Sequence, residues 1–165
     1  MNENYIFRKI KKEEVPIMFG LILDRMEWMN ENNIKQWNVH GYDTLFPLSF
    51  YEKECKNGNL YVLVNATTNE LVSGAVLLEI DDRWNDNEPS LYLHNYVSKI
   101  GKSGVGKIFM KHAEEYAKSK GKKYFRLDSA EDNEKLTKYY EKQGFKPAGK
   151  CSVGPYIGVL RQKEI

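Results

Sequence analysis

A lysine-bearing, glycine-rich loop stands directly before a strongly amphipathic segment in the stretch GKSGVGKIFMKHAEEYAKSKG (Gly101–Gly121). Glycines let backbone N–H groups approach an anion closely. A helix starting near Val105 would aim the positive end of its dipole at the same place, where Lys102 and Lys107 add charge. The pattern predicts a phosphate-binding loop, and an ordinary strand–helix turn with solvated lysines is the alternative.

Two common nucleotide-binding motifs do not fit this loop. Gly101 and Gly106 have the spacing of a Walker A loop and Lys107 follows, but Ile108 stands where that loop needs a magnesium-binding hydroxyl. A dinucleotide-binding Gly-x-Gly-x-x-Gly that starts at Gly104 has Phe109 at its third glycine. Nucleotide hydrolysis and dinucleotide binding are therefore disfavoured.

The segment Ser90–Phe145 resembles the acetyl-CoA-binding core of the GNAT superfamily of N-acetyltransferases, in its bacterial type. That superfamily has a strand, then Arg/Gln-x-x-Gly-x-Gly/Ala, a helix, a second strand, an asparagine, and a helix carrying Tyr shortly before Gly-Phe. Gly104–Gly106 matches the loop, Asn133 the asparagine, Tyr140 the tyrosine and Gly144-Phe145 the closing pair. Several motifs in the right order are more specific than one glycine pair.

The resemblance has one further match and one departure. The segment Trp28–Trp37 is similar to a tryptophan-flanked segment of a bacterial subgroup of the superfamily. Gly101 stands where Arg or Gln is usual, so one side-chain contact to the pyrophosphate is missing, and Lys102 would partly replace its charge.

The resemblance implies acetyl-CoA as co-substrate and assigns the residues that hold it. The backbone of one of two splayed parallel strands would pair with the pantetheine amides, the loop N–H groups would take the pyrophosphate, and an asparagine would bind the pantetheine arm. The cofactor-binding set is Tyr96, Val97, Lys102, Ser103, Gly104, Val105, Gly106, Lys107, Asn133 and Tyr140. No metal is implied.

Acyl transfer to an amine needs a deprotonated amine, a donor for the tetrahedral oxyanion and a proton for the leaving thiolate. Tyr140 is expected to protonate the leaving thiolate, because it lies four residues before Gly144. The alternative is that Tyr140 only packs its helix onto the sheet. The base is left open between His94 on the central strand, Glu79 acting through water, and no dedicated base.

The acceptor site is indicated only by aromatic residues. Trp28, Trp37 and Tyr42 lie where the superfamily builds its acceptor pocket, and core packing explains the tryptophans as well. The acidic stretch 79–88 either attracts a cationic amine or forms a solvated loop.

Composition limits the other function classes. The 165 residues, 41% of them hydrophobic, suit one domain, residues 1–165, with one core. A net charge of +2 gives no case for nucleic acid or an anionic membrane. No apolar run is long enough to span a bilayer and no signal peptide is indicated. Cys55 and Cys151 are expected to be free thiols, which fits a cytoplasmic location.

The periodicity predicts an α+β fold with a mixed, largely antiparallel sheet of about six or seven strands and about four helices. The expected strands are 5–10, 60–64, 71–80, 90–97, 123–129, 145–150 and 156–161, and the expected helices start near residues 15, 50, 105 and 133. The region Asn38–Leu48 reads as a loop broken by Gly41 and Pro47.

The sequence therefore predicts an N-acetyltransferase that moves an acetyl group from acetyl-CoA to a primary amine of a small molecule or peptide, by direct attack in a ternary complex. Neither cysteine lies in the matched motifs, so no acyl-cysteine intermediate is indicated. A non-catalytic CoA-binding or partner-binding domain is the alternative. Oligomeric state is not fixed, and a homodimer is compatible with the sequence.

Overall fold

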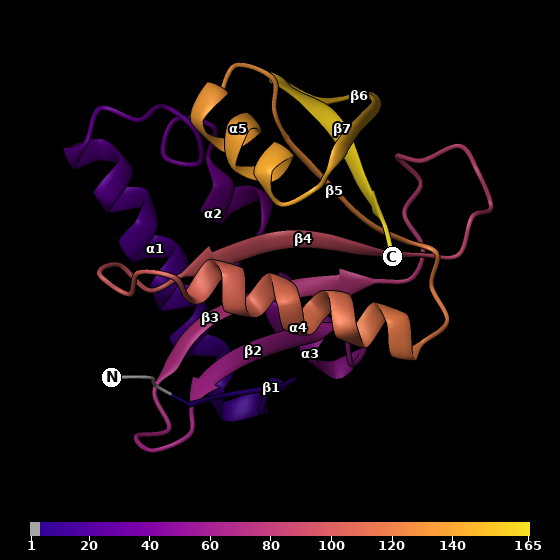
Figure 1. Ribbon diagram of the computed structural model, residues 1–165. Helices are drawn as coiled ribbons and strands as arrows, with labels where there is room; N and C mark the ends of the chain where they lie inside the picture. The colour runs from indigo at the N-terminus through magenta and orange to yellow at the C-terminus, as the bar shows by residue number, and fades with distance from the viewer. Residues whose placement is uncertain (1–3) are drawn as a thin grey trace. The chain divides into compact units, whose positions relative to one another are not determined.

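The computed structural model describes residues 4–165 (Figure 1). The elements in chain order are β1 (Tyr5–Lys9), η1 (Lys12–Glu14), α1 (Val15–Glu31), α2 (Tyr42–Leu45), α3 (Leu48–Lys56), β2 (Leu60–Asn65), β3 (Leu71–Leu78), β4 (Ser90–Ser98), α4 (Val105–Ser119), β5 (Tyr124–Ala130), α5 (Glu134–Lys142), β6 (Lys146–Val153) and β7 (Tyr156–Glu164). Every strand and long helix expected from the sequence is confirmed.

The strands form a mixed sheet in the order β1-β2-β3-β4-β5-β7-β6. The pairs β1–β2, β2–β3, β5–β7 and β6–β7 are antiparallel, whereas β4 and β5 are parallel. The expected α+β fold with a largely antiparallel mixed sheet is confirmed. A parallel pair needs a long crossover connection, and α4 supplies it.

Backbone contacts divide the chain into two compact units. The first contains the residues up to Val76 together with Asn95–His112, and the second contains Leu77–His94 and Ala113–Ile165. The expectation of a single domain stays a prediction.

The first unit is built around α1 and β2. Helix α1 buries Val15, Met18 and Ile22 on one face, as their spacing of three and four residues requires. Strand β2 is buried along its whole length. On β3, a Cβ added at Gly74 would lie 2.7 Å from the Met18 Sδ atom, so the absence of a side chain lets the helix approach the sheet.

The second unit packs α5 beside an antiparallel ribbon. Strand β5 pairs with β7 from Tyr124 to Ala130, and β6 leads into β7 through a turn at Gly154 (φ +57°). Trp84 of the β3–β4 loop, Tyr92 of β4 and Leu160 of β7 form a buried cluster. This ribbon positions the polar side chains of β5 and β7.

One prediction about the connections was wrong. The stretch Asn38–Leu48 was expected to be a loop, but it contains the one-turn helix α2 (Tyr42–Leu45). Gly41 precedes it in a left-handed conformation (φ +65°), and the N–H groups of Thr44 and Leu45 both bond to the Gly41 carbonyl. A single turn is too short to show hydrophobic periodicity.

Candidate active site

The glycine loop of the first unit makes a turn that only glycines adopt easily. Gly101 has φ +82° and Gly104 has φ +83°, and helix α4 begins at the next residue, Val105. The first N–H groups of a helix have no carbonyl partner within it and carry its positive dipole end. Since Ser103 and Lys107 are exposed, this end of α4 is open to solvent and suited to an anion.

The lysines of this loop are partly paired. Glu70 accepts from Lys99 Nζ at 3.1 Å, and Lys102 Nζ lies 3.5 Å from its other carboxylate oxygen. Hydrogen bonding from Lys99 lowers the pKa of Glu70, so this carboxylate is charged at neutral pH. Lys102 therefore has a competing partner and is a weaker substitute for a missing arginine than the sequence indicated.

Strand β4 carries an irregularity next to the expected cofactor strand. Asn95 has φ +55°, which is rare for a residue with a side chain, and its Nδ2 donates to the Tyr42 hydroxyl at 2.6 Å. Tyr96 places its ring 5.3 Å from that of Phe109, and Val97 is buried. The strained residue thus connects the strand to helix α2, as expected near a functional site.

Two of the three aromatic candidates for the acceptor pocket lie together in the first unit. The rings of Trp37 and Tyr42 stack at 4.2 Å with an interplanar angle of 6°. Trp28 instead lies beneath the Arg25 guanidinium at 4.8 Å, and Arg25 also donates to the Ser98 carbonyl at 3.0 Å. Trp37 and Tyr42 form a stacked aromatic pair, whereas Trp28 packs against a cation of the protein itself.

The parallel strands pair over a short stretch only. In the described part of the chain the β4–β5 pairing covers Ser90–Tyr92 against Tyr124–Arg126, although the strands run on to Ser98 and Ala130. Beyond Arg126, strand β5 keeps its ladder to β7. The two parallel strands are therefore hydrogen-bonded to each other over three residues of each.

In the second unit, His94 lies beside two buried carboxylates. Its Nε2 atom is 2.7 Å from Asp81 Oδ2, and its Nδ1 atom is 3.9 Å from Asp128 Oδ1. The side chains of Asp81 and Asp128 are 6% and 8% exposed, and that of His94 is 16% exposed. Burial opposes ionisation of Asp81, but the hydrogen bonds from His94 and from the Arg83 N–H lower its pKa below the usual value.

Asp128 is held by two further groups. Arg83 Nη1 donates to its Oδ1 at 2.8 Å, and the Tyr156 hydroxyl donates to its Oδ2 at 2.6 Å. Burial, followed by the Asp128 charge, raises the pKa of Tyr156, so this phenol stays protonated. Sequence reasoning missed Asp81, Asp128 and Tyr156 as members of a cluster with His94.

The other candidate base has a different environment. The Glu79 side chain is 50% exposed, and Lys122 Nζ lies 2.8 Å from Oε1. The bond to Lys122 lowers the Glu79 pKa, which makes this carboxylate a weaker base. The geometry favours His94 over Glu79.

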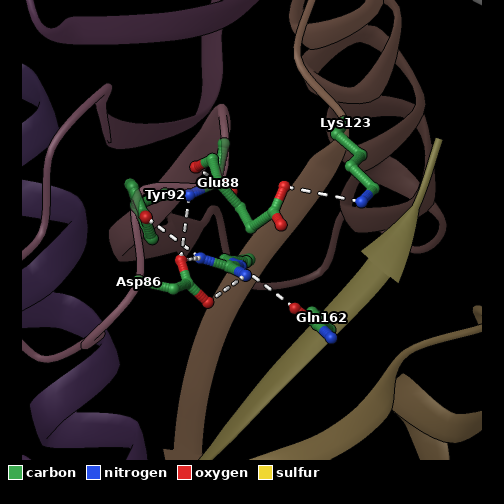
Figure 2. A network of polar contacts seen from close by, with 7 residues as sticks. Asp86, Glu88, Tyr92, Lys123 and Gln162 are labelled. Atoms are coloured by element: carbon green, nitrogen blue, oxygen red, sulfur yellow. Dashed lines mark hydrogen bonds and ion pairs between the residues drawn. The ribbon is translucent and has the colours of Figure 1, made fainter.

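Two further acidic residues of the β3–β4 loop, Asp86 and Glu88, pair with cations of the protein itself, as Figure 2 shows. Asp86 binds Arg126 through both carboxylate oxygens, at 2.8 and 2.9 Å, and Glu88 lies 3.4 Å from Lys123 Nζ. Arg126 is 1% exposed and lies 4.1 Å from the Trp84 ring centroid. This pairing fastens the loop to β5, so Asp86 is not a free docking point for a ligand.

The two motif residues near α5 are both placed by packing and capping. Asn133 caps α5, because its Oδ1 accepts from the Leu136 N–H at 3.0 Å. Its Nδ2 amide is therefore the group that can donate to a ligand. Tyr140 is 9% exposed, with its ring 5.4 Å from Tyr139 and 5.7 Å from Phe145.

The model of the acetyltransferase (GNAT) family matches residues 22–145. The chain belongs to the GNAT family. A search of curated proteins gave no match. The resemblance found in the sequence is therefore confirmed, and this GNAT chain is an acyltransferase by family.

Solved structures share the fold of this GNAT protein. A GNAT acetyltransferase from Listeria monocytogenes has a TM-score of 0.81 at 20% identity, covering 100% of this chain and 99% of that one. A GNAT acetyltransferase from Streptococcus agalactiae also has a TM-score of 0.81, at 18% identity with 99% of each chain covered. A PaiA N-acetyltransferase from Thermoplasma acidophilum, solved with coenzyme A, has a TM-score of 0.74 at 16% identity, covering 98% and 99%.

The turn explains one departure of this GNAT chain from its family pattern. A side chain at Gly101 would have to adopt φ +82°, which residues other than glycine avoid. Gly101 therefore suits this turn better than the Arg or Gln of the family pattern would. Residues 4–165 bring no three His, Cys, Asp or Glu side chains into a group that could hold a metal ion, and none of their helices is long and apolar enough to cross a membrane.

Proposed function

We propose that the protein is an N-acetyltransferase that transfers the acetyl group of acetyl-CoA to a primary amine. The glycine turn that opens the exposed start of α4, inside the matched family region, carries this proposal. Two structures of similar fold support acetyl-CoA as the acetyl donor. The PaiA N-acetyltransferase was solved with coenzyme A, and a protein from Bacillus anthracis described as a streptothricin acetyltransferase was solved with acetyl-CoA.

In this proposal the chain holds the donor with backbone groups. The N–H groups from Lys102 to Lys107 receive the pyrophosphate, and the backbone at Tyr96 and Val97 pairs with the pantetheine amides as an added strand would. Asn133 donates from Nδ2, since its Oδ1 is occupied by the helix cap. Few charged side chains take part in binding acetyl-CoA, which agrees with the weak contribution expected from Lys102.

In the proposed reaction the amine nitrogen gives up two protons, one to His94 and one to Tyr140. The acceptor enters as an ammonium and gives one proton to His94, so its nitrogen lone pair can attack the thioester carbonyl. The C–N bond forms, the C–S bond breaks, and the thiolate takes a proton from Tyr140. The second proton of the amine nitrogen restores Tyr140, and the first leaves His94 for solvent. The products are an N-acetyl amine, CoA and one released proton.

The proposal is tested first by calorimetry with CoA and by thermal unfolding with and without it. We expect heat release and a higher melting temperature, because a ligand that binds only the folded state stabilises it. Absence of binding at millimolar CoA would contradict the proposal.

Thiol release with a panel of amines then separates an enzyme from a non-catalytic CoA-binding domain. The panel contains polyamines, amino acids, aminoglycosides and peptide N-termini. Turnover on any amine well above the hydrolysis of the CoA ester excludes the non-catalytic alternative. Binding of CoA with no turnover on the panel would favour it.

The role of Tyr140 has a matched control in its neighbour. Tyr140→Phe should lower kcat by about 10²–10⁴-fold, the usual contribution of a general acid, with little change in acetyl-CoA affinity. Tyr139→Phe also loses one hydroxyl on the same helix and should leave kcat nearly unchanged. Equal kcat values for the two variants would remove Tyr140 from the mechanism.

The two cysteines are both free thiols in the structure, which is compatible with a reducing compartment. We therefore propose that the enzyme acts in the cytoplasm, as the sequence predicted.

A further inference from the structure

We propose that the His94 cluster is the binding site of the acceptor's ammonium group, and that it selects amines without a neighbouring carboxylate. This inference rests on the proposed acetyltransferase function and adds the position and the class of the acceptor. It is carried by Asp81, Arg83, His94, Asp128 and Tyr156, which all lie in the second unit.

The hydrogen bonds fix which nitrogen of His94 can accept a proton. A carboxylate can only accept, so Nε2 carries the hydrogen in its 2.7 Å contact with Asp81. In neutral His94 the lone pair is then on Nδ1, which has no hydrogen bond within the described residues. A proton acceptor is thus held in a fixed orientation by Asp81, as a base requires.

The distance from Nδ1 to Asp128 suits a shared donor. At 3.9 Å the two atoms are too far apart for a hydrogen bond between them. An ammonium nitrogen can lie about 2.8 Å from each of the two atoms at once. This is possible because the 3.9 Å between Nδ1 and Oδ1 is well under twice the length of such a hydrogen bond. An ammonium group has three N–H donors, so it can serve both atoms at once.

The charge of the cluster favours a cation over a water molecule at this position. The two buried carboxylates of Asp81 and Asp128 face one guanidinium, that of Arg83. Burial raises the pKa values of the other titratable neighbours, Cys151 and Tyr156, so both are uncharged near pH 7. Balancing both carboxylates therefore needs one more positive charge, which a bound ammonium supplies whether it keeps its proton or passes it to Nδ1 of His94.

The same charge defines the class of acceptor. A carboxylate next to the amine would lie close to Asp81 and Asp128, and like charges at short range repel. Arg83 does not offset this, since it already donates to Asp128. We infer that the acceptor is a simple amine, polyamine, amino sugar or similar cation, and that the α-amino group of a free amino acid is rejected.

Nuclear magnetic resonance can test this site without any turnover, because the chain has only 3 histidines. The imidazole signals of His94 are assigned with a His94→Gln variant. They are then followed while three probes of nearly equal size are added to the full chain, with and without saturating CoA. The probes are glycinamide, a cation; glycine, with the same amine beside a carboxylate; and glycolamide, with a hydroxyl in place of the amine.

We expect saturable shifts of the His94 signals with glycinamide, at least about tenfold weaker apparent affinity for glycine, and no shift with glycolamide. Asp128→Asn should weaken glycinamide binding about tenfold or more, since it removes the charged acceptor. Asp82→Asn, an exposed carboxylate beside Asp81, is the matched control and should bind like the wild type.

Three results would overturn the inference: no His94 shift with glycinamide in either state, equal shifts with glycolamide, or equal affinity for glycine. If Asp128→Asn does not fold, the three probes on the wild-type chain still decide. Failure of the proposed function is distinguishable, since it appears as absent CoA binding while the His94 shifts persist. Conversely, CoA binding and turnover without a His94 response contradicts only this inference.

Discussion

The ion pair between Asp86 and Arg126 gives the sharpest stability prediction. Asp86→Ala leaves a guanidinium that is 1% exposed without its carboxylate. Removing one partner of a fully buried pair costs about 3–5 kcal/mol. Asp86 is itself 44% exposed, so water can replace part of its interaction, and the bonds from Arg126 to Tyr92 and Gln162 remain. We expect a loss of about 2 kcal/mol.

Calorimetry and chemical denaturation measure this loss. For a chain of this size about 2 kcal/mol corresponds to a melting temperature lower by roughly 4–8 °C. Trp84 fluorescence should also change, because the Arg126 guanidinium lies over its ring. Asp82→Ala, an exposed carboxylate of the same loop, is the control. If the two variants agree within about 0.5 kcal/mol, Arg126 does not depend on Asp86 and our reasoning fails.

Three further predictions concern the turn, the cap and acid. Gly104→Ala should destabilise the protein by about 1–2 kcal/mol, because φ is +83° although a Cβ meets no atom within 4 Å; an unchanged melting temperature would show that the turn relaxes. Asn133→Ala should lower the unfolding free energy by about 1 kcal/mol, because the helix cap is lost, and should also weaken CoA binding. Asn133→Asp should keep the cap and lose only CoA affinity. Unfolding and calorimetry experiments on both variants measure the two effects separately. The pKa values of Asp81 and Asp86 are lowered in the folded state, so the stability that their charged forms contribute is full above about pH 4. This contribution is lost as the pH falls through their folded-state pKa values. An unfolding free energy that stays constant down to about pH 2 would contradict this.

Much of the fold could be predicted because its elements have strong local signals. Helix α4 has apolar residues at regular helical spacing, and β2 is a continuous apolar strand, so both were recognised. Helix α2 was missed because one turn has no period, and its start depends on the φ of Gly41.

The candidate site could be predicted only where residues follow one another in a motif. Asn133 and Gly104 stand at fixed positions around helix starts, so their places were recognised. The neighbours of His94 come from a loop, from β5 and from β7, and no sequence spacing relates Asp81, Asp128 and Tyr156. Arg126 was unremarkable in the sequence, because a charged residue on a strand usually points to solvent.

The short β4–β5 pairing gives the sheet an inner strand edge as well as its outer ones, and the two kinds of edge are protected differently. Outer strand β6 carries Pro147, flanking lysines and an irregular register, which all discourage another chain from adding to it. The inner side of β5 from Leu127 to Ser129 has no proline and no lysine. We therefore expect the protein to aggregate through this edge first when no extended ligand is bound along it. The onset of aggregation would then show whether a ligand occupies the edge, even when no acetyl group is transferred.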